Sequence, residues 1–140
     1  MYAVDVNYLS VTIASLVNML IGYLWYSPYI FGKKWAQLSG ISRRNKSMFG
    51  RILSRYILIY FLISFFTAYI LANFSDYLGT MTIGEGAQLG LWIWFGFIAT
   101  TVLYDYIYPK KSASWTLYFI DTGYILAGLM IMAMILAVWR

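Results

Sequence analysis

Four long apolar stretches, separated by short polar connections, constrain this chain more than any other feature of its sequence. They lie at about residues 8–27, 52–73, 87–108 and 115–139. Crossing about 30 Å of hydrocarbon takes an α-helix of about 20 residues, which each stretch provides. Hydrophobic residues make up 62% of the chain and charged residues 11%, too few to cover a soluble domain of this size. The sequence therefore predicts an all-α integral membrane bundle of four transmembrane helices, forming a single domain over residues 1–140.

The end of the first stretch has the pattern of a helix leaving a bilayer. Gly-Tyr-Leu-Trp-Tyr-Ser-Pro, residues 22–28, is followed by Lys33 and Lys34. Amphipathic rings favour the membrane interface, and charge belongs in the water beyond it. Pro28 disfavours helical geometry at the preceding residue and ends the helix. Residues 108–111, Tyr-Pro-Lys-Lys, end the third stretch in a similar way. This similarity indicates either two hairpin repeats or the same physical need at two exits.

Basic residues are concentrated in alternate connections, and Arg140 alone lies elsewhere, at the C-terminus. Nine of the ten Lys and Arg residues fall within 28–56 and 109–115, whereas the 74–86 loop carries Asp76 and Glu85 and no basic residue. The positive-inside rule then places both basic connections in the cytoplasm and both termini outside, in a cell (plasma or inner) membrane. We interpret the cluster as an orientation signal beside anionic lipid headgroups, not as a nucleic-acid site. These lipid-facing residues are Lys33, Lys34, Arg43, Arg44, Lys46, Arg51, Arg55, Lys110 and Lys111.

The chain contains neither cysteine nor histidine. Disulfides, thiolate chemistry, imidazole metal sites and histidine bases are therefore excluded. The sequence also offers no pairing of a nucleophile with a base. We therefore expect no metal, no cofactor and no enzymatic activity.

Two acidic residues, Asp105 and Asp121, lie inside the third and fourth stretches. At about 1.5 Å per residue, both fall within about 10 Å of the cytoplasmic boundary, where adjacent antiparallel helices could share one polar pocket. An ionisable group at this depth is costly without a partner, and Arg55 and Lys110 enter the membrane at the same level. Two interpretations stay open: a satisfied ion pair or hydrogen-bond cluster, and a proton or cation site. The candidate polar or ion site comprises Asn18, Thr101, Asp105, Asp121 and Tyr124.

Small residues recur at helical spacing along the apolar stretches. In lipid, small residues face other helices because they allow close approach of the backbones. Gly86 and Gly90 form a GxxxG pair, for which we favour packing within the chain over a dimer face. The candidate packing residues are Ser15, Gly22, Gly86, Gly90, Gly123 and Gly128.

Three motifs cover most of the chain in order. The first is Trp25-Tyr26-Ser27-Pro28, followed by Phe31-Gly32-Lys33 and Trp35; the others are residues 96–101, Gly-Phe-Ile-Ala-Thr-Thr, and residues 120–124, Ile-Asp-Thr-Gly-Tyr. Together they resemble an uncharacterised family of small membrane proteins known as domain of unknown function 1761. The resemblance implies a prokaryotic membrane protein with four spans, and it implies no particular activity.

We expect a non-catalytic integral membrane protein that acts through helix packing, as a homo-oligomer or as an accessory subunit of a larger membrane complex. The alternative is a small transporter or channel for a proton, cation or small solute, using Asp105 and Asp121. Because four helices rarely enclose a pore, the alternative predicts at least a dimer.

Overall fold

The computed structural model describes residues 6–40, 46–107 and 114–139, with the backbone alone for residues 46–55. The regular structure in these ranges is helical, in the order α1 (Tyr8–Trp25), α2 (Gly32–Leu38), α3 (Lys46–Leu78), α4 (Ile83–Ile93), η2 (Trp94–Ala99), α5 (Thr100–Ile107) and α6 (Trp115–Val138). Within the described ranges, four segments are long and apolar enough to cross a membrane: Tyr8–Trp25, Tyr56–Leu78, Ile83–Ile107 and Trp115–Val138. This confirms the predicted all-α fold with four helices able to span a membrane.

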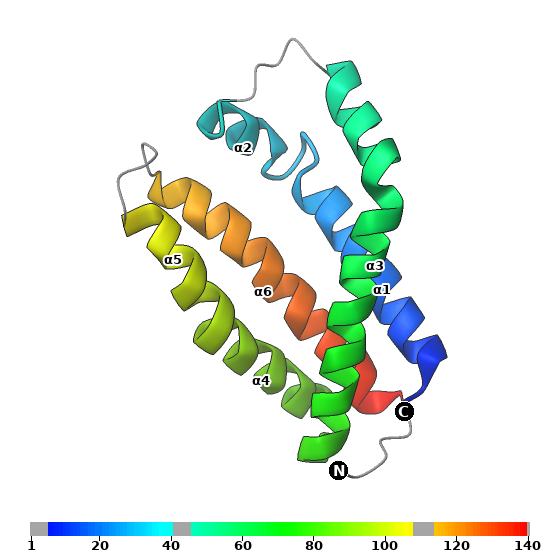
Figure 1. Ribbon diagram of the computed structural model, residues 1–140. Helices are drawn as coiled ribbons and strands as arrows, with labels where there is room; N and C mark the ends of the chain where they lie inside the picture. The colour runs from blue at the N-terminus through cyan, green and yellow to red at the C-terminus, as the bar shows by residue number, and fades with distance from the viewer. Residues whose placement is uncertain (1–5, 41–45, 108–113, 140) are drawn as a thin grey trace.

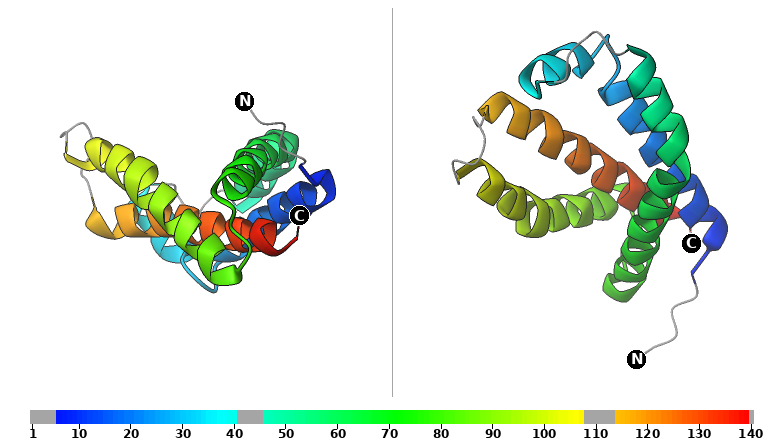
Figure 2. Two further views of the ribbon diagram at one scale, coloured as in Figure 1. Left: turned by 90° about the horizontal axis from the view of Figure 1, so that it is seen from below. Right: turned by 45° about the horizontal axis from the view of Figure 1, so that its top comes forward.

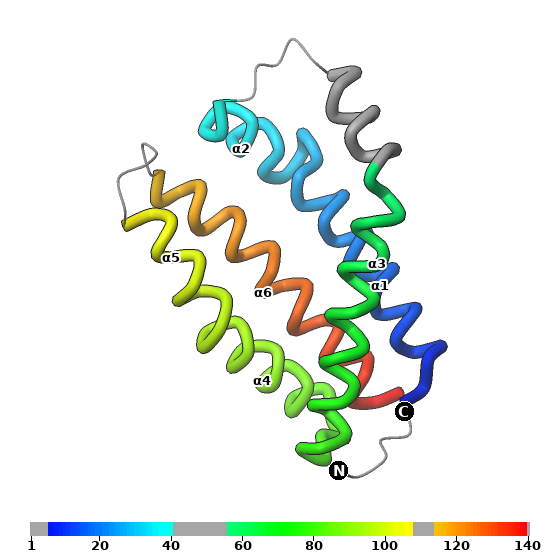
Figure 3. Tube along the Cα trace, viewed as in Figure 1, coloured from blue at the N-terminus to red at the C-terminus, as the bar shows by residue number. Residues whose placement is uncertain are grey.

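The third span is one continuous helix with a π-helical segment at its centre. Residues Trp94–Ala99 form a π-helical segment between α4 and α5. Figure 3 shows α4, this segment and α5 following one another alongside α6. A π-helical turn changes which side chains face a neighbouring helix, and such turns are frequent at functional sites.

The connection between α3 and α4 is shorter than the sequence predicts. We expected a loop over residues 74–86, but α3 continues to Leu78 and α4 begins at Ile83. Gly79, with φ of 68°, ends α3. The Thr82 hydroxyl accepts a hydrogen bond from the Glu85 backbone N–H, and the Glu85 carboxylate accepts one from the Thr82 backbone N–H. Such a capping box starts a helix sharply, which leaves only residues 79–82 as a turn.

The spans pair in chain order, and α6 is the central helix. α1 packs against α3, α4 packs against α6, and α6 also contacts α1 and α3. α1 begins and α6 ends at one end of the molecule, together with the 79–82 turn (Figure 1). α2, the end of α5 and the start of α6 lie at the opposite end, here called the α2 end.

The hydrophobic core lies toward the end that holds the 79–82 turn. Its buried members come from the first half of α1 and the second halves of α3 and α6. Toward the α2 end α3 diverges from the α4–α6 pair, as the two views of Figure 2 show, whereas α1 stays against α6 through the bond of Trp25 to the Ile120 carbonyl. The buried core residues are Val11, Ala14, Ala68, Leu71, Leu129, Met132, Ala133 and Leu136.

Candidate functional site

Asp121, in the second turn of α6, receives hydrogen bonds from three other parts of the chain. Its Oδ1 accepts from the Tyr26 hydroxyl at 3.0 Å and from the Trp35 Nε1–H at 2.9 Å. Its Oδ2 accepts from the Tyr106 hydroxyl at 3.4 Å. Tyr26 follows α1, Trp35 lies in α2 and Tyr106 lies in α5. We call these four residues the Asp121 cluster, because one half-buried carboxylate joins three elements to α6.

A tight corner after α1 positions Tyr26 and Trp35. The Ser27 carbonyl accepts hydrogen bonds from the backbone N–H groups of Ile30, at 3.2 Å, and Gly32, at 2.9 Å. A Cβ at Gly32 would collide with the backbone carbonyls of Tyr26 and Ser27, so the corner requires glycine there. The chain therefore folds back immediately after Pro28, and Trp35 reaches α6 from the first turn of α2.

Two indole groups bind the backbone of α6 on either side of Asp121. Trp25 Nε1–H donates to the Ile120 carbonyl at 3.0 Å, and Trp94 Nε1–H donates to the Thr122 carbonyl at 2.7 Å. The buried Tyr118 hydroxyl donates in the other direction, to the Ala99 carbonyl, at 2.9 Å. These bonds attach the start of α6 to the end of α1 and to the π-helical segment. Buried Trp and Tyr need such partners for their polar groups.

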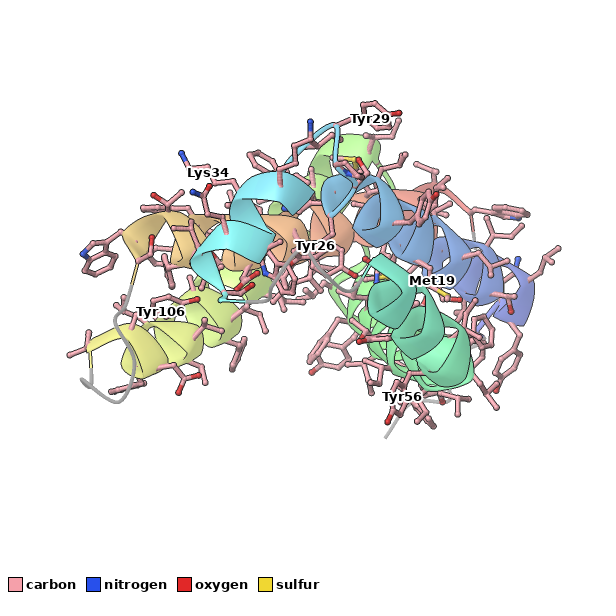
Figure 4. The ribbon with its side chains drawn as sticks, turned by 90° about the horizontal axis from the view of Figure 1, so that it is seen from above. Met19, Tyr26, Tyr29, Lys34, Tyr56 and Tyr106 are labelled. Carbon is pink, nitrogen blue, oxygen red and sulfur yellow. The ribbon has the colours of Figure 1, made fainter. Side chains whose placement is uncertain are left out.

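Aromatic rings surround the Asp121 cluster. The Tyr26 ring meets the Trp35 ring at 69°, with centroids 5.4 Å apart, and the Tyr124 ring at 63°, with centroids 5.5 Å apart. The Tyr106 ring meets Tyr118 at 74° and 5.3 Å. Tyr26 lies on the inner side of the α2 segment, whereas Tyr29 and Lys34 lie on its outer side (Figure 4). The rings around the half-buried carboxylate thus pack edge to face on one another, one of the arrangements that aromatic pairs favour.

The donors around Asp121 carry no charge. Phenol and indole groups satisfy the carboxylate by hydrogen bonding without neutralising it. Burial, and next the neighbouring Asp121 carboxylate, raise the pKa of the Tyr26 hydroxyl above its usual range. A phenol is protonated at neutral pH even at its ordinary pKa, so Tyr26 is a donor to Asp121.

The predicted residues Asn18 and Tyr124 lie in the interface between α1 and α6. Asn18 Nδ2–H donates to the Ser64 hydroxyl of α3 at 2.9 Å, and that hydroxyl donates to the Ser15 carbonyl at 3.0 Å. A Cβ at Gly128 would overlap Asn18 Oδ1, and one at Gly22 would lie 3.1 Å from the Tyr124 ring. Asn18 therefore joins three helices, and only the Tyr124 ring extends to the Asp121 cluster.

Asp105 and Thr101, the other predicted polar residues, are exposed on α5. Tyr106, next to Asp105 in the chain, makes the bond to Asp121 instead. Adjacent helical residues point about 100° apart, so only one of the two faces α6. Sequence reasoning did not include Tyr106, Trp35 and Trp94 among the candidate site residues. The available signal was the place of Trp35 in the first of the three motifs; Tyr106 and Trp94 had none.

Like Gly22 and Gly128, the other three predicted packing glycines contact α6 or lie within it at points of close approach. A Cβ at Gly86 would lie 2.5 Å from the Ala133 carbonyl oxygen, and one at Gly90 would lie 2.6 Å from the Met130 Cα. A Cβ at Gly123 would lie 3.2 Å from the Trp25 ring. The backbones of α4 and α6 thus touch at the GxxxG pair, within one chain.

The basic residues are described only in part. Lys33 and Lys34 are exposed on α2. The side chains of Arg43, Arg44, Lys46, Arg51, Arg55, Lys110 and Lys111 lie outside the described residues. The expected pairing of Asp105 and Asp121 with Arg55 or Lys110 therefore also falls on side chains outside the described residues. Among the residues that the structure describes, no group of three Asp, Glu, His or Cys side chains could hold a metal ion.

Residues 9–137 match the family described as Protein of unknown function (DUF1761). The chain belongs to this family. The motif residues that carry the resemblance to the DUF1761 family meet in the folded chain: Trp25, Tyr26 and Trp35 all bind the 120–122 segment. No curated protein and no solved structure matches the sequence. The four apolar helices indicate a multi-pass membrane protein.

Proposed function

We propose that this chain is a non-catalytic integral membrane protein that acts through helix packing, as a homo-oligomer or as an accessory subunit of a larger membrane complex. The observation that supports this most is the use of its polar groups. Asn18, Trp25, Trp94 and Asp121 each form hydrogen bonds between helices. Among the described residues, no buried side-chain nitrogen or oxygen lacks a hydrogen-bond partner. In lipid, such bonds hold helices together.

The hydroxyl groups support a non-catalytic role. Those of Thr12, Thr67 and Thr122 donate to backbone carbonyls one turn earlier in their own helices, at 2.7, 2.9 and 2.7 Å. The Ser64 hydroxyl donates to the Ser15 carbonyl. A serine or threonine nucleophile instead donates to a side-chain base that can take its proton. The hydroxyls that do donate to a carboxylate are the phenols of Tyr26 and Tyr106 in the Asp121 cluster.

The start of the second span supports a further contact with lipid or other helices. Five consecutive residues of α3, from Tyr56 to Tyr60, are exposed by 41 to 65%. Because consecutive residues point all around a helix, this part of α3 is partly exposed on every side within one chain. In a membrane, lipid or further helices cover it.

We expect the protein to purify from membranes in mild detergent with a mass above that of one chain. The physical reason is that the second span buries little within a single chain: 17% of its most apolar 18 residues are buried. Native mass spectrometry measures the mass and identifies any companion subunit. A single chain both in native mass spectra and in cross-linked membranes would contradict the proposal.

We further propose that the protein lies in the cell membrane with both termini outside and the α2 end in the cytoplasm. The distribution of Lys and Arg supports this orientation. Anionic headgroups then contact the exposed Lys33 and Lys34, and Tyr29, which is 96% exposed, lies beside them at the interface.

Cysteine labelling in intact cells tests the orientation, since the chain has no cysteine of its own. Met81 is 69% exposed in the turn between α3 and α4. We expect Met81→Cys to react with a membrane-impermeant maleimide from outside, and Lys34→Cys to react only after the cells are opened. The reverse pattern would show the opposite orientation, and labelling of both would show that the turn and α2 share one side.

A second candidate function is transport of a proton, cation or small solute. The observation that favours it is the Asp121 carboxylate, which lies in a span among uncharged donors. Ionisable residues in such positions mark ion and solute paths. Asp105 is a weaker participant than the sequence suggests, because it is exposed outside the cluster.

A further inference from the structure

The carboxylate of Asp121 retains acceptor capacity on one side. Oδ1 accepts two hydrogen bonds, at 3.0 and 2.9 Å. Oδ2 accepts one of 3.4 Å from Tyr106, beyond the usual range for a hydroxyl donor. A carboxylate offers about four acceptor positions. Oδ2 is therefore the atom that can accept another and shorter hydrogen bond.

The cluster also lacks a positive partner among its donors. All three are neutral, and the described basic residues, Lys33 and Lys34, are exposed on α2. Asp121 is half-buried within a helix able to span the membrane. A carboxylate in such surroundings is stabilised by a cation that pairs with it.

The surrounding rings favour one class of cation. Tyr26 meets the rings of Trp35 and Tyr124 at steep angles, with centroids 5.4 and 5.5 Å away. Aromatic rings at angles to one another, beside a carboxylate, form the chemistry that recognises alkylated ammonium groups. A divalent metal suits the site less, because Mg²⁺ and Ca²⁺ need six or more oxygen ligands.

We propose that the Asp121 cluster binds an organic ammonium ion. The positive nitrogen pairs with Oδ2 of Asp121, and the alkyl groups contact the rings of Tyr26, Trp35 and Tyr106. This names a ligand class for the second candidate function, whose site it shares, and it requires binding but not transport.

Choline and its neutral isostere 3,3-dimethylbutan-1-ol test this on the full chain in lipid nanodiscs. Isothermal titration calorimetry is expected to give a Kd for choline of about 1 mM or tighter. The isostere should bind at least about tenfold more weakly, because it keeps the shape and lacks the charge. No binding of choline, or equal binding of the two compounds, would overturn the proposal. If an arginine or lysine of the chain itself occupied Oδ2, choline would not bind.

Two matched variants locate the binding site. Asp121→Asn keeps an amide oxygen for Tyr26 and Trp35 and removes the charge, so choline affinity should fall at least about tenfold. Asp105→Asn removes an exposed carboxylate outside the cluster and should change the affinity for choline less than about twofold. Unchanged affinity in Asp121→Asn, or equal losses in both variants, would contradict a site at Asp121. If circular dichroism shows that Asp121→Asn does not fold, the comparison of choline with its isostere decides whether the chain binds an ammonium ion.

Uptake of labelled choline into proteoliposomes separates binding from transport. Binding without uptake would refute transport of this ion and leave the ammonium site standing. Absence of binding would refute the ammonium site whatever the oligomeric state or the transport of other solutes.

Discussion

Gly90→Val is expected to lower the free energy of unfolding by about 3 kcal/mol. A Cβ at this position would lie 2.6 Å from the Met130 Cα and 2.8 Å from the Leu129 carbonyl oxygen. These are backbone atoms, which cannot move aside as the end of a flexible side chain can. α4 and α6 would have to separate, and the contacts between them would be lost. Unfolding in detergent with increasing dodecyl sulfate, followed by circular dichroism, measures the change.

Gly84→Val is the matched control, because it places the same side chain on the same helix. A Cβ at Gly84 meets nothing within 4 Å. We expect its effect on the free energy of unfolding to stay within about 0.5 kcal/mol. Equal destabilisation by both substitutions would mean that valine disturbs α4 itself, and that the close approach to α6 is not the cause.

Asp121→Leu is expected to destabilise the protein by about 3 kcal/mol and to release α2 from α6. The substitution removes the acceptor of three hydrogen bonds, from Tyr26, Trp35 and Tyr106. α2 has no fully buried residue, and the Trp35 side chain forms its hydrogen bond to α6. Hydrogen exchange measured by mass spectrometry should show faster exchange of the amides of residues 32–38.

Asp105→Leu serves as the control for this loss of a carboxylate. Asp105 is exposed, and the hydrogen bond to α6 at this level comes from its neighbour Tyr106. We expect a change within about 0.5 kcal/mol and unchanged exchange in α2. Retained protection of α2 in Asp121→Leu would show that ring contacts, such as that between Tyr26 and Trp35, hold α2 without the carboxylate.

Much of the architecture could be predicted from the chain because hydrophobic length is a local property. A run of about 20 apolar residues can satisfy its backbone in lipid only as a helix, so the spans follow from composition. The prediction was weaker at the 74–86 connection. Its glycines indicated a loop, but the capping box of Thr82 and Glu85 starts α4 early.

The candidate site was predicted only in part. Asp121 was identified from its charge inside an apolar stretch, but its described partners are aromatic donors, and the side chains of the basic residues expected there are not among those described. Along the chain, Tyr26 lies 95 residues from Asp121, Trp35 lies 86 residues away and Tyr106 lies 15 residues away. No local pattern indicates which of the many tyrosines and tryptophans faces this carboxylate.

The sequence by itself therefore determined the four helices able to cross a membrane, the break after the first at Pro28, and the concentration of cations in alternate connections. These follow from interactions of each segment with lipid and water. Only the tertiary structure decided that Tyr106 and not Asp105 faces α6, and that the corner after α1 carries Trp35 to Asp121. The physical reason is that the rotation and spacing of packed helices depend on close contacts between distant residues, such as Gly90 against Met130.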